Sequence, residues 1–95
     1  MKRFVVILEN YCEEIGIPPE KIKGRDRHVD VDTARKVFWK VMHDKGLSRH
    51  FLARMFNRDV LTIRRGIERA NNFLSISDKG TIYYAGICEK VAKWE

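Results

Sequence analysis

The stretch Phe56–Ile63, with the sequence FNRDVLTI, decides the fold because it joins two helical patterns through a tight turn. On its N-terminal side apolar residues recur at helical spacing, at Leu47, Phe51, Leu52, Met55 and Phe56. On its C-terminal side the same spacing recurs at Ile63, Ile67, Ala70 and Leu74. The sequence therefore predicts two helices packed across a short turn, a helix-turn-helix over residues 48–74.

The outward face of the second helix carries groups that suit DNA. Thr62, Arg65 and Arg69 follow one another at i, i+3 and i+7, so they share one side of the helix. In a helix-turn-helix the second helix lies in the major groove, where such side chains meet base edges and phosphates. We therefore expect this helix to bind double-stranded DNA.

The positive charge of the chain is concentrated around this motif. The whole chain carries a net charge of +6. Residues 20–70 hold fourteen Lys and Arg against seven Asp and Glu, a net charge of +7, whereas the two flanks together carry −1. Such an excess favours a polyanionic partner, although a merely solvated basic face has the same composition.

The remaining pattern predicts one all-α domain over residues 1–95, a small helical bundle of about five to six helices. A first helix ends at Gly16, and a Pro18-Pro19 turn leads through a short helix to a basic loop over residues 23–29. The apolar stripe of the first helix is Phe4, Val5, Ile7, Leu8, Tyr11, Cys12 and Ile15. A polar hinge over 75–80 precedes a C-terminal helix over about 80–94, with Tyr83, Ile87, Val91 and Trp94 on its apolar side.

Helix starts are marked by residues that cap backbone N–H groups. Asp30 or Asp32 is expected to cap the third helix, and Ser48 and Asp59 the two helices of the motif. Trp39 falls off the centre of the third helix's inward stripe, which consists of Val31, Ala34, Val37, Phe38, Val41 and Met42.

Several classes of protein are not favoured by the composition. Cys12 and Cys88 lack the spacing of metal ligands, so we expect two reduced core residues in a cytoplasmic protein. The histidines are scattered, no metal or cofactor site is expected, and no apolar run approaches the roughly eighteen residues of a membrane span. No Ser/His/Asp set or carboxylate pair marks catalytic residues, so we expect no enzyme.

Four short motifs follow one another along the chain: IGIPPEKIKGR at 15–25, Ala34-Arg35, Leu47-Ser48, and Arg58-Asp59 with Thr62-Ile63. In this order and spacing they resemble the C-terminal DNA-binding domain of the bacterial chromosomal replication initiator DnaA, from about Tyr11 onward. The resemblance implies a Trp-repressor-like helix-turn-helix and a role in regulating DNA replication or transcription. No G-x-x-x-x-G-K-[ST] motif is present, so we expect neither the initiator's ATPase nor a bound nucleotide.

The resemblance also implies individual DNA contacts. Arg27 matches a loop arginine that enters the minor groove, with Lys23 and Arg25 beside it, and Asp59 matches an aspartate that contacts bases. The other matched positions are the turn arginine Arg58, Thr62 near the phosphates, and Arg49 and His50 at the start of the first motif helix. For Arg35 we expect a structural pairing with a neighbouring acid.

Val60 and Leu61 depart from the family, which has histidine and threonine there. These two side chains can meet only apolar groups such as a thymine methyl, so we expect a target sequence different from the initiator's. We expect a monomeric, sequence-selective DNA-binding protein. One alternative is a protein-interaction adaptor that uses Val60, Leu61, Tyr83, Tyr84 and Trp94, and the other is an unrelated helix-turn-helix repressor.

Overall fold

The computed structural model describes residues 2–93, and within that range it contains six α-helices and no β-strand. The helices are α1 (Lys2–Ile15), α2 (Pro19–Lys23), α3 (Val29–Asp44), α4 (Arg49–Phe56), α5 (Val60–Ser75) and α6 (Lys79–Val91). The expected small all-α bundle is confirmed.

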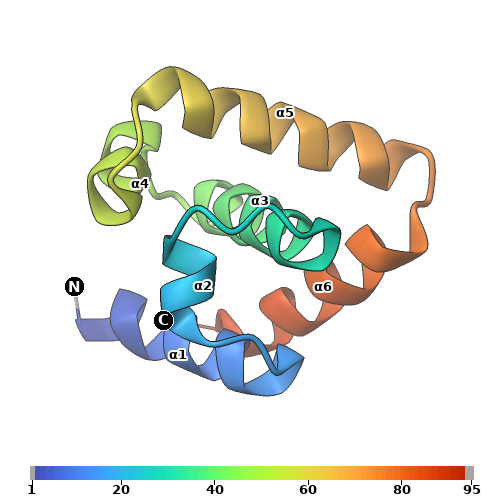
Figure 1. Cartoon of the computed structure of the whole chain (residues 1–95), viewed down its shortest axis with the longest axis horizontal. Helices are drawn as coiled ribbons and strands as arrows, with labels where there is room; N and C mark the ends of the chain where they lie inside the picture. Colours follow the sequence, from blue (N-terminus) through green and yellow to red (C-terminus); the bar gives the residue numbers. More distant parts are fainter. Residues whose placement is uncertain (1, 94–95) are drawn as a thin grey trace.

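Helix α3 runs through the middle of the molecule, with α5 along one side and α1 and α6 along the other (Figure 1). Its expected inward stripe is buried throughout. The Tyr11 hydroxyl of α1 donates a hydrogen bond of 2.8 Å to the Ala34 carbonyl in the interior, which fixes α1 against α3. The core therefore lies around α3, and α5 covers it from the side opposite α1 and α6 (Figure 1).

The two helices of the motif begin as expected. Ser48 Oγ accepts a hydrogen bond from the Phe51 N–H at 3.0 Å, and Asp59 Oδ1 accepts one from the Thr62 N–H at 3.0 Å. Each bond satisfies a backbone donor that has no partner inside its helix. Both predicted N-caps are confirmed.

The turn between α4 and α5 is closed by its own backbone. Asn57 ends α4 in the left-handed region, with φ of +53°, a conformation that asparagine tolerates better than most residues. The next N–H, of Arg58, bonds to the Ala53 carbonyl at 2.9 Å. This pairing satisfies a carbonyl of the last helical turn and sets the short path from α4 to α5.

The predicted cap of the third helix is wrong. Helix α3 begins earlier, at Val29, and His28 precedes it without a side-chain cap. Asp30 and Asp32 consequently fall in the first turn, where negative charge is favoured by the positive end of the helix. Asp26 instead fixes the backbone directly before α3, because its Oδ1 accepts a hydrogen bond from the His28 N–H at 2.9 Å and lies 2.7 Å from His28 Nδ1.

Trp39 was expected off the centre of the stripe, but it is buried, with 2% of its surface exposed. Helix α5 passes directly over it at Gly66, where an added Cβ would lie 2.6 Å from the ring atoms Cε3 and Cζ3. The ring of Phe56 meets it edge-on, with centroids 5.7 Å apart. The absence of a side chain at Gly66 therefore lets α5 cover the indole.

The C-terminal part differs from expectation in its bounds and its facing. Helix α5 continues to Ser75, so the link to α6 covers only residues 76–78, and α6 spans 79–91 rather than 80–94. Tyr83, which was expected on the apolar side of this helix, is 58% exposed, and Trp94 lies outside the described residues. In α1, Val5 was expected in the apolar stripe but is 41% exposed. Cys12 and Cys88 are free and buried, as expected.

Candidate nucleic-acid interface

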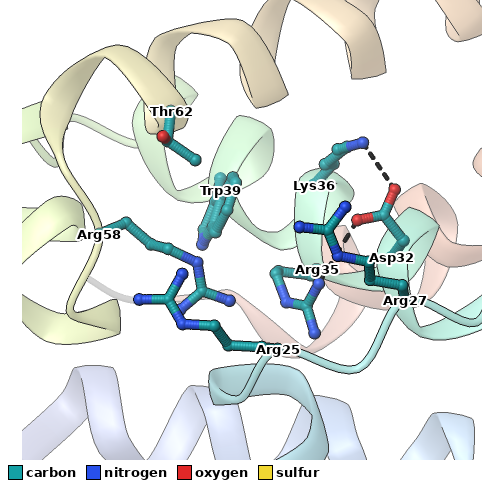
Figure 2. Close-up of a pocket in the computed structure, with 8 residues that line it drawn as sticks. All are labelled: Arg25, Arg27, Asp32, Arg35, Lys36, Trp39, Arg58 and Thr62. Atoms are coloured by element: carbon teal, nitrogen blue, oxygen red, sulfur yellow. Dashed lines mark hydrogen bonds and ion pairs between the residues drawn. The ribbon is translucent and has the colours of Figure 1, made fainter.

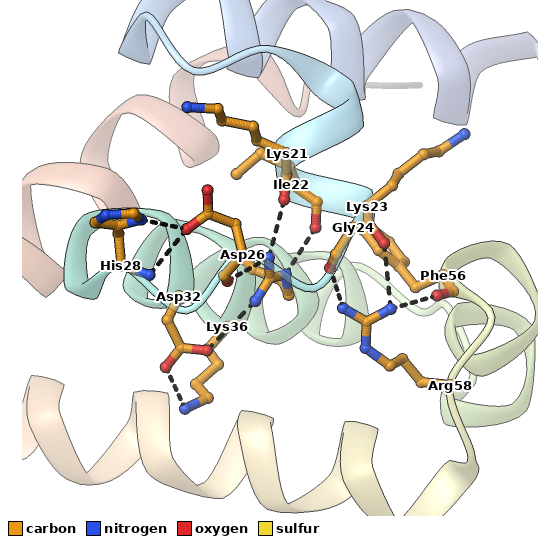
Figure 3. Close-up of polar contacts among 11 residues, drawn as sticks. Lys21, Ile22, Lys23, Gly24, Asp26, His28, Asp32, Lys36, Phe56 and Arg58 are labelled. Atoms are coloured by element: carbon orange, nitrogen blue, oxygen red, sulfur yellow. Dashed lines mark hydrogen bonds and ion pairs between the residues drawn. The ribbon is translucent and has the colours of Figure 1, made fainter.

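The basic loop between α2 and α3 is held by the buried guanidinium of Arg35, on α3. Its Nε donates to the Ile22 carbonyl at 2.7 Å, and its Nη2 donates to the carbonyls of Lys21 at 2.9 Å and Asp26 at 3.0 Å (Figure 3). Asp32 Oδ1 lies 3.4 Å from Nη1, so the expected pairing with an acid is present but is the longest of these contacts. Burial lowers the pKa of Arg35, which still leaves a guanidinium charged at neutral pH.

Arg58 ties the same loop to the turn of the helix-turn-helix. Its Nη1 donates to the carbonyls of Phe56 at 2.8 Å and Lys23 at 3.1 Å, and its Nη2 donates to the Gly24 carbonyl (Figure 3). The carbonyls of Lys23 and Gly24 lie at the end of the short helix α2, and that of Phe56 lies at the end of α4, where a helix leaves its carbonyls without intrahelical partners. Arg58 therefore positions the loop, and its expected contact with DNA stays a prediction.

Arg25 and Arg27 remain on the outside of the loop that these two arginines hold. Arg25 makes one long hydrogen bond, 3.4 Å from its Nη2 to the Asn57 carbonyl. Both side chains line a cleft of about 490 Å³ between the loop, α3 and the start of α5 (Figure 2). The other residues of this cleft are Asp32, Arg35, Lys36, Trp39, Arg58 and Thr62.

A smaller cleft of about 180 Å³ continues this surface along α5. Arg27 lines both clefts, and Arg69 of α5 lines the smaller one. Thr62, Arg65 and Arg69 are all exposed and share one side of α5. The structure thus brings the predicted loop residues and the predicted stripe of α5 together on one face.

The start of α5 presents a mixed surface. Asp59 is exposed and caps the helix through one carboxylate oxygen. Val60 is half-buried and packs against the core, whereas Leu61 is 43% exposed. Leu61 is therefore the apolar side chain that this end of α5 offers to a partner.

Seven predicted contact residues line neither cleft: Lys23, Arg49, His50, Asp59, Val60, Leu61 and Arg65. Arg49 and His50 are exposed in the first turn of α4, and within residues 2–93 no hydrogen bond joins their side chains to the loop. The Lys23 carbonyl accepts a hydrogen bond from Arg58, while the Lys23 ammonium group points away from Arg58 in Figure 3. Their contacts with DNA stay predictions.

Lys36 and Trp39 belong to the site although the sequence analysis did not select them. Lys36 Nζ lies 2.6 Å from Asp32 Oδ2, one helical turn earlier. A signal was available, because Asp32, Lys36 and Trp39 follow at i, i+4 and i+7 and so share one side of α3. That side also carries Arg35, which holds the loop.

In the described part of the chain, no group of three His, Cys, Asp or Glu side chains could hold a metal ion. None of the helices in residues 2–93 has the length and apolar character needed to cross a membrane. In comparisons with known proteins, the chain matches no family model, no curated protein and no solved structure.

Proposed function

We propose that this chain binds double-stranded DNA through the face formed by the basic loop and the outward side of α5. The observation that carries the proposal is the juxtaposition of Arg27, on the loop, with Arg69, on α5, around one cleft. Among the described residues neither side chain is paired with an acid. Two separate segments therefore direct uncompensated positive charge to the same side, as binding to a polyanion requires.

The dimensions of this face suit a duplex. From Thr62 to Arg69 the outward stripe of α5 extends about 10 Å along the helix axis, compared with a major groove about 12 Å wide. With α5 in the major groove, the loop faces the adjacent minor groove, whose negative potential attracts arginine. In this arrangement α5 reads bases, and Arg25 and Arg27 contact the minor groove and phosphates.

In this proposal, side chains at the start of α5 determine which DNA sequences the protein prefers. The Asp59 carboxylate can accept a hydrogen bond from a cytosine or adenine amino group through the oxygen that does not cap the helix. The exposed Leu61 can contact a thymine methyl. The protein in this proposal acts as a monomer in the cytoplasm, and the DnaA-like motifs support a role in regulating replication or transcription.

Fluorescence anisotropy with a labelled duplex at several salt concentrations tests the proposal. The affinity should fall as salt rises, and Arg27→Ala should weaken it by about 1–3 kcal/mol without changing the melting temperature. Lys90→Ala is the matched control, because it removes one positive charge from an exposed position on α6, which packs against α1 and α3. An equal loss in both variants would mean that net charge, not the loop, determines binding.

Selection of bound duplexes from a random pool tests base reading. Asp59→Asn keeps a good N-cap but adds a donor, so it should change the selected sequence more than the stability. If the parent and the variant select the same duplexes, Asp59 acts only as a cap. If the parent binds all duplexes equally, the sequence-selective part of the proposal is wrong.

An adaptor is the second candidate, because Leu61 is 43% and Tyr83 58% exposed. Exposed apolar side chains of this size suit contacts with another protein. An adaptor would show no salt-dependent affinity for DNA in the anisotropy assay. A dimer that binds a palindromic duplex would instead favour an unrelated helix-turn-helix repressor.

A further inference from the structure

We propose that the cleft beside the basic loop is a phosphate-binding site whose innermost donor is the indole N–H of Trp39. The phosphate can belong to a small phosphorylated molecule or to the backbone of DNA. The second source rests on the proposed function, whereas the first does not. The shared chemistry is a tetrahedral anion held by several donors at once.

The lining of the cleft is strongly cationic. Five basic side chains, Arg25, Arg27, Arg35, Lys36 and Arg58, face a single acid, Asp32. Lys36 Nζ approaches one oxygen of that carboxylate at 2.6 Å, and Arg35 Nη1 approaches the other at 3.4 Å. The acid is therefore already engaged, and most of the positive charge of the cleft is balanced by no carboxylate.

Trp39 gives a second, independent indication of a ligand. Among the buried side-chain nitrogen and oxygen atoms of residues 2–93, its Nε1 is the one that lacks a hydrogen-bond partner. Figure 2 shows this nitrogen on the side of the ring that faces the guanidinium groups of Arg25 and Arg58. Because a buried donor without a partner is unfavourable, an acceptor that reaches it gains more than an acceptor at the surface would.

The cations around Trp39 also repel one another. The pKa of Arg58 is lowered by burial first and then by the neighbouring charges of Arg35 and Arg25. An anion in the cleft would relieve this repulsion. Arg25 can make room for it, because that side chain is exposed and is held only by the 3.4 Å bond to Asn57.

A phosphate fits this lining better than a carboxylate does. A carboxylate is planar and is well satisfied by one guanidinium, whereas a phosphate monoester carries about −1.5 to −2 charges and three acceptor oxygens. Here the guanidinium groups of Arg25 and Arg58 lie beside the indole N–H (Figure 2), and Lys36 and Thr62 line the same cleft. The volume of about 490 Å³ lies within the range of small-molecule sites.

A DNA backbone would reach the same place. If α5 enters the major groove and the loop enters the adjacent minor groove, the strand that separates the two grooves must cross the cleft between them. One of its phosphates would then lie above Trp39. A small phosphorylated molecule in the cleft would consequently compete with DNA.

The ¹H–¹⁵N resonance of the Trp39 indole is the direct probe, and Trp94→Phe assigns it by removing the second indole signal. Inorganic pyrophosphate is added at constant ionic strength, with sodium chloride as the control titration. The Trp39 resonance should shift and saturate with pyrophosphate and should not respond to chloride. An unchanged Trp39 resonance with both pyrophosphate and a short duplex would overturn the proposal.

Two variants test the assignment of the donors, with pyrophosphate binding measured by calorimetry. Trp39→Phe removes the indole N–H. Arg25→Ala removes an exposed cation whose one hydrogen bond within residues 2–93 is the long bond to the Asn57 carbonyl. Each should weaken binding about tenfold or more, and Lys90→Ala should leave it unchanged. If Trp39→Phe does not fold, the Arg25 variant and the indole titration decide, and unchanged affinity in Arg25→Ala counts against the site.

A short duplex, titrated in the same way, separates the two sources. If both ligands move the indole resonance and compete, one phosphate site serves both. If only the duplex moves it, the occupant is a backbone phosphate. If pyrophosphate shifts the resonance and no duplex binds, the phosphate site is supported and the proposed function is wrong. If a duplex binds in the anisotropy assay but neither ligand shifts the resonance, the phosphate site is wrong and the proposed function is unaffected.

Discussion

Replacement of Arg35 by lysine should destabilise the protein although it preserves the charge. The guanidinium joins three carbonyls, of Ile22, Lys21 and Asp26, at 2.7–3.0 Å. A lysine ammonium is a single point of donation and can reach about one of these three. Two hydrogen bonds to a charged group, each worth about 1.5–3 kcal/mol, are therefore lost, and water recovers part of that at the loop.

We expect Arg35→Lys to lower the free energy of unfolding by about 2–4 kcal/mol. Urea unfolding followed by circular dichroism measures this, and at an m-value of about 1 kcal/mol/M the midpoint should fall by about 2–4 M. Arg54→Lys is the control, because Arg54 is exposed on α4 and should change stability by no more than about 0.5 kcal/mol. A loss below about 1 kcal/mol in Arg35→Lys would refute the inference that this side chain holds the loop.

Three further predictions concern other parts of the fold. Gly66→Ala places a Cβ 2.6 Å from the Trp39 ring, so it should cost about 1–3 kcal/mol of overpacking, seen as a lower melting temperature. Burial raises the pKa of the Cys12 thiol to about 11, so that thiol should react with Ellman's reagent at about pH 8 only after urea unfolds the protein. The Thr81 hydroxyl and N–H hold the pKa of Asp78 below its ordinary 3.8, so their stabilising effect is complete above that pH and is lost as the carboxyl protonates. The stability difference between the parent and Asp78→Asn in urea should therefore shrink as the pH falls below 3.8, and a constant difference would contradict this.

The helices were predictable where periodicity and capping residues agreed. Ser48 and Asp59 cap α4 and α5 because a short acceptor stands directly before an apolar pattern in each case. The start of α3 was missed because two acids, Asp30 and Asp32, also suit a cap, and acids are equally favourable inside the first turn. Sequence spacing alone does not distinguish these two positions.

Whether the Trp39 side chain is buried or exposed could not be predicted from α3 alone. A residue at the edge of a helical stripe can be exposed or covered, and what decides here is that α5 carries Gly66 at the crossing point. The same contact brings α5 close enough for Thr62 to share a cleft with the loop. A long-range contact of this kind leaves no periodic signal in either helix.

The hydrogen bonds by which Arg35 and Arg58 hold the basic loop were also beyond local patterns, because they join residues 9–35 positions apart. Arg35 and Arg58 donate mainly to backbone carbonyls, which are neutral, rather than to Asp or Glu. Had two carboxylates held the loop instead, each would have cancelled one positive charge on the face that we assign to DNA. Carbonyl partners satisfy the same donors and leave the field of both guanidinium groups directed at the cleft. The loop can therefore be held in place without losing the charge that makes it useful for binding an anion.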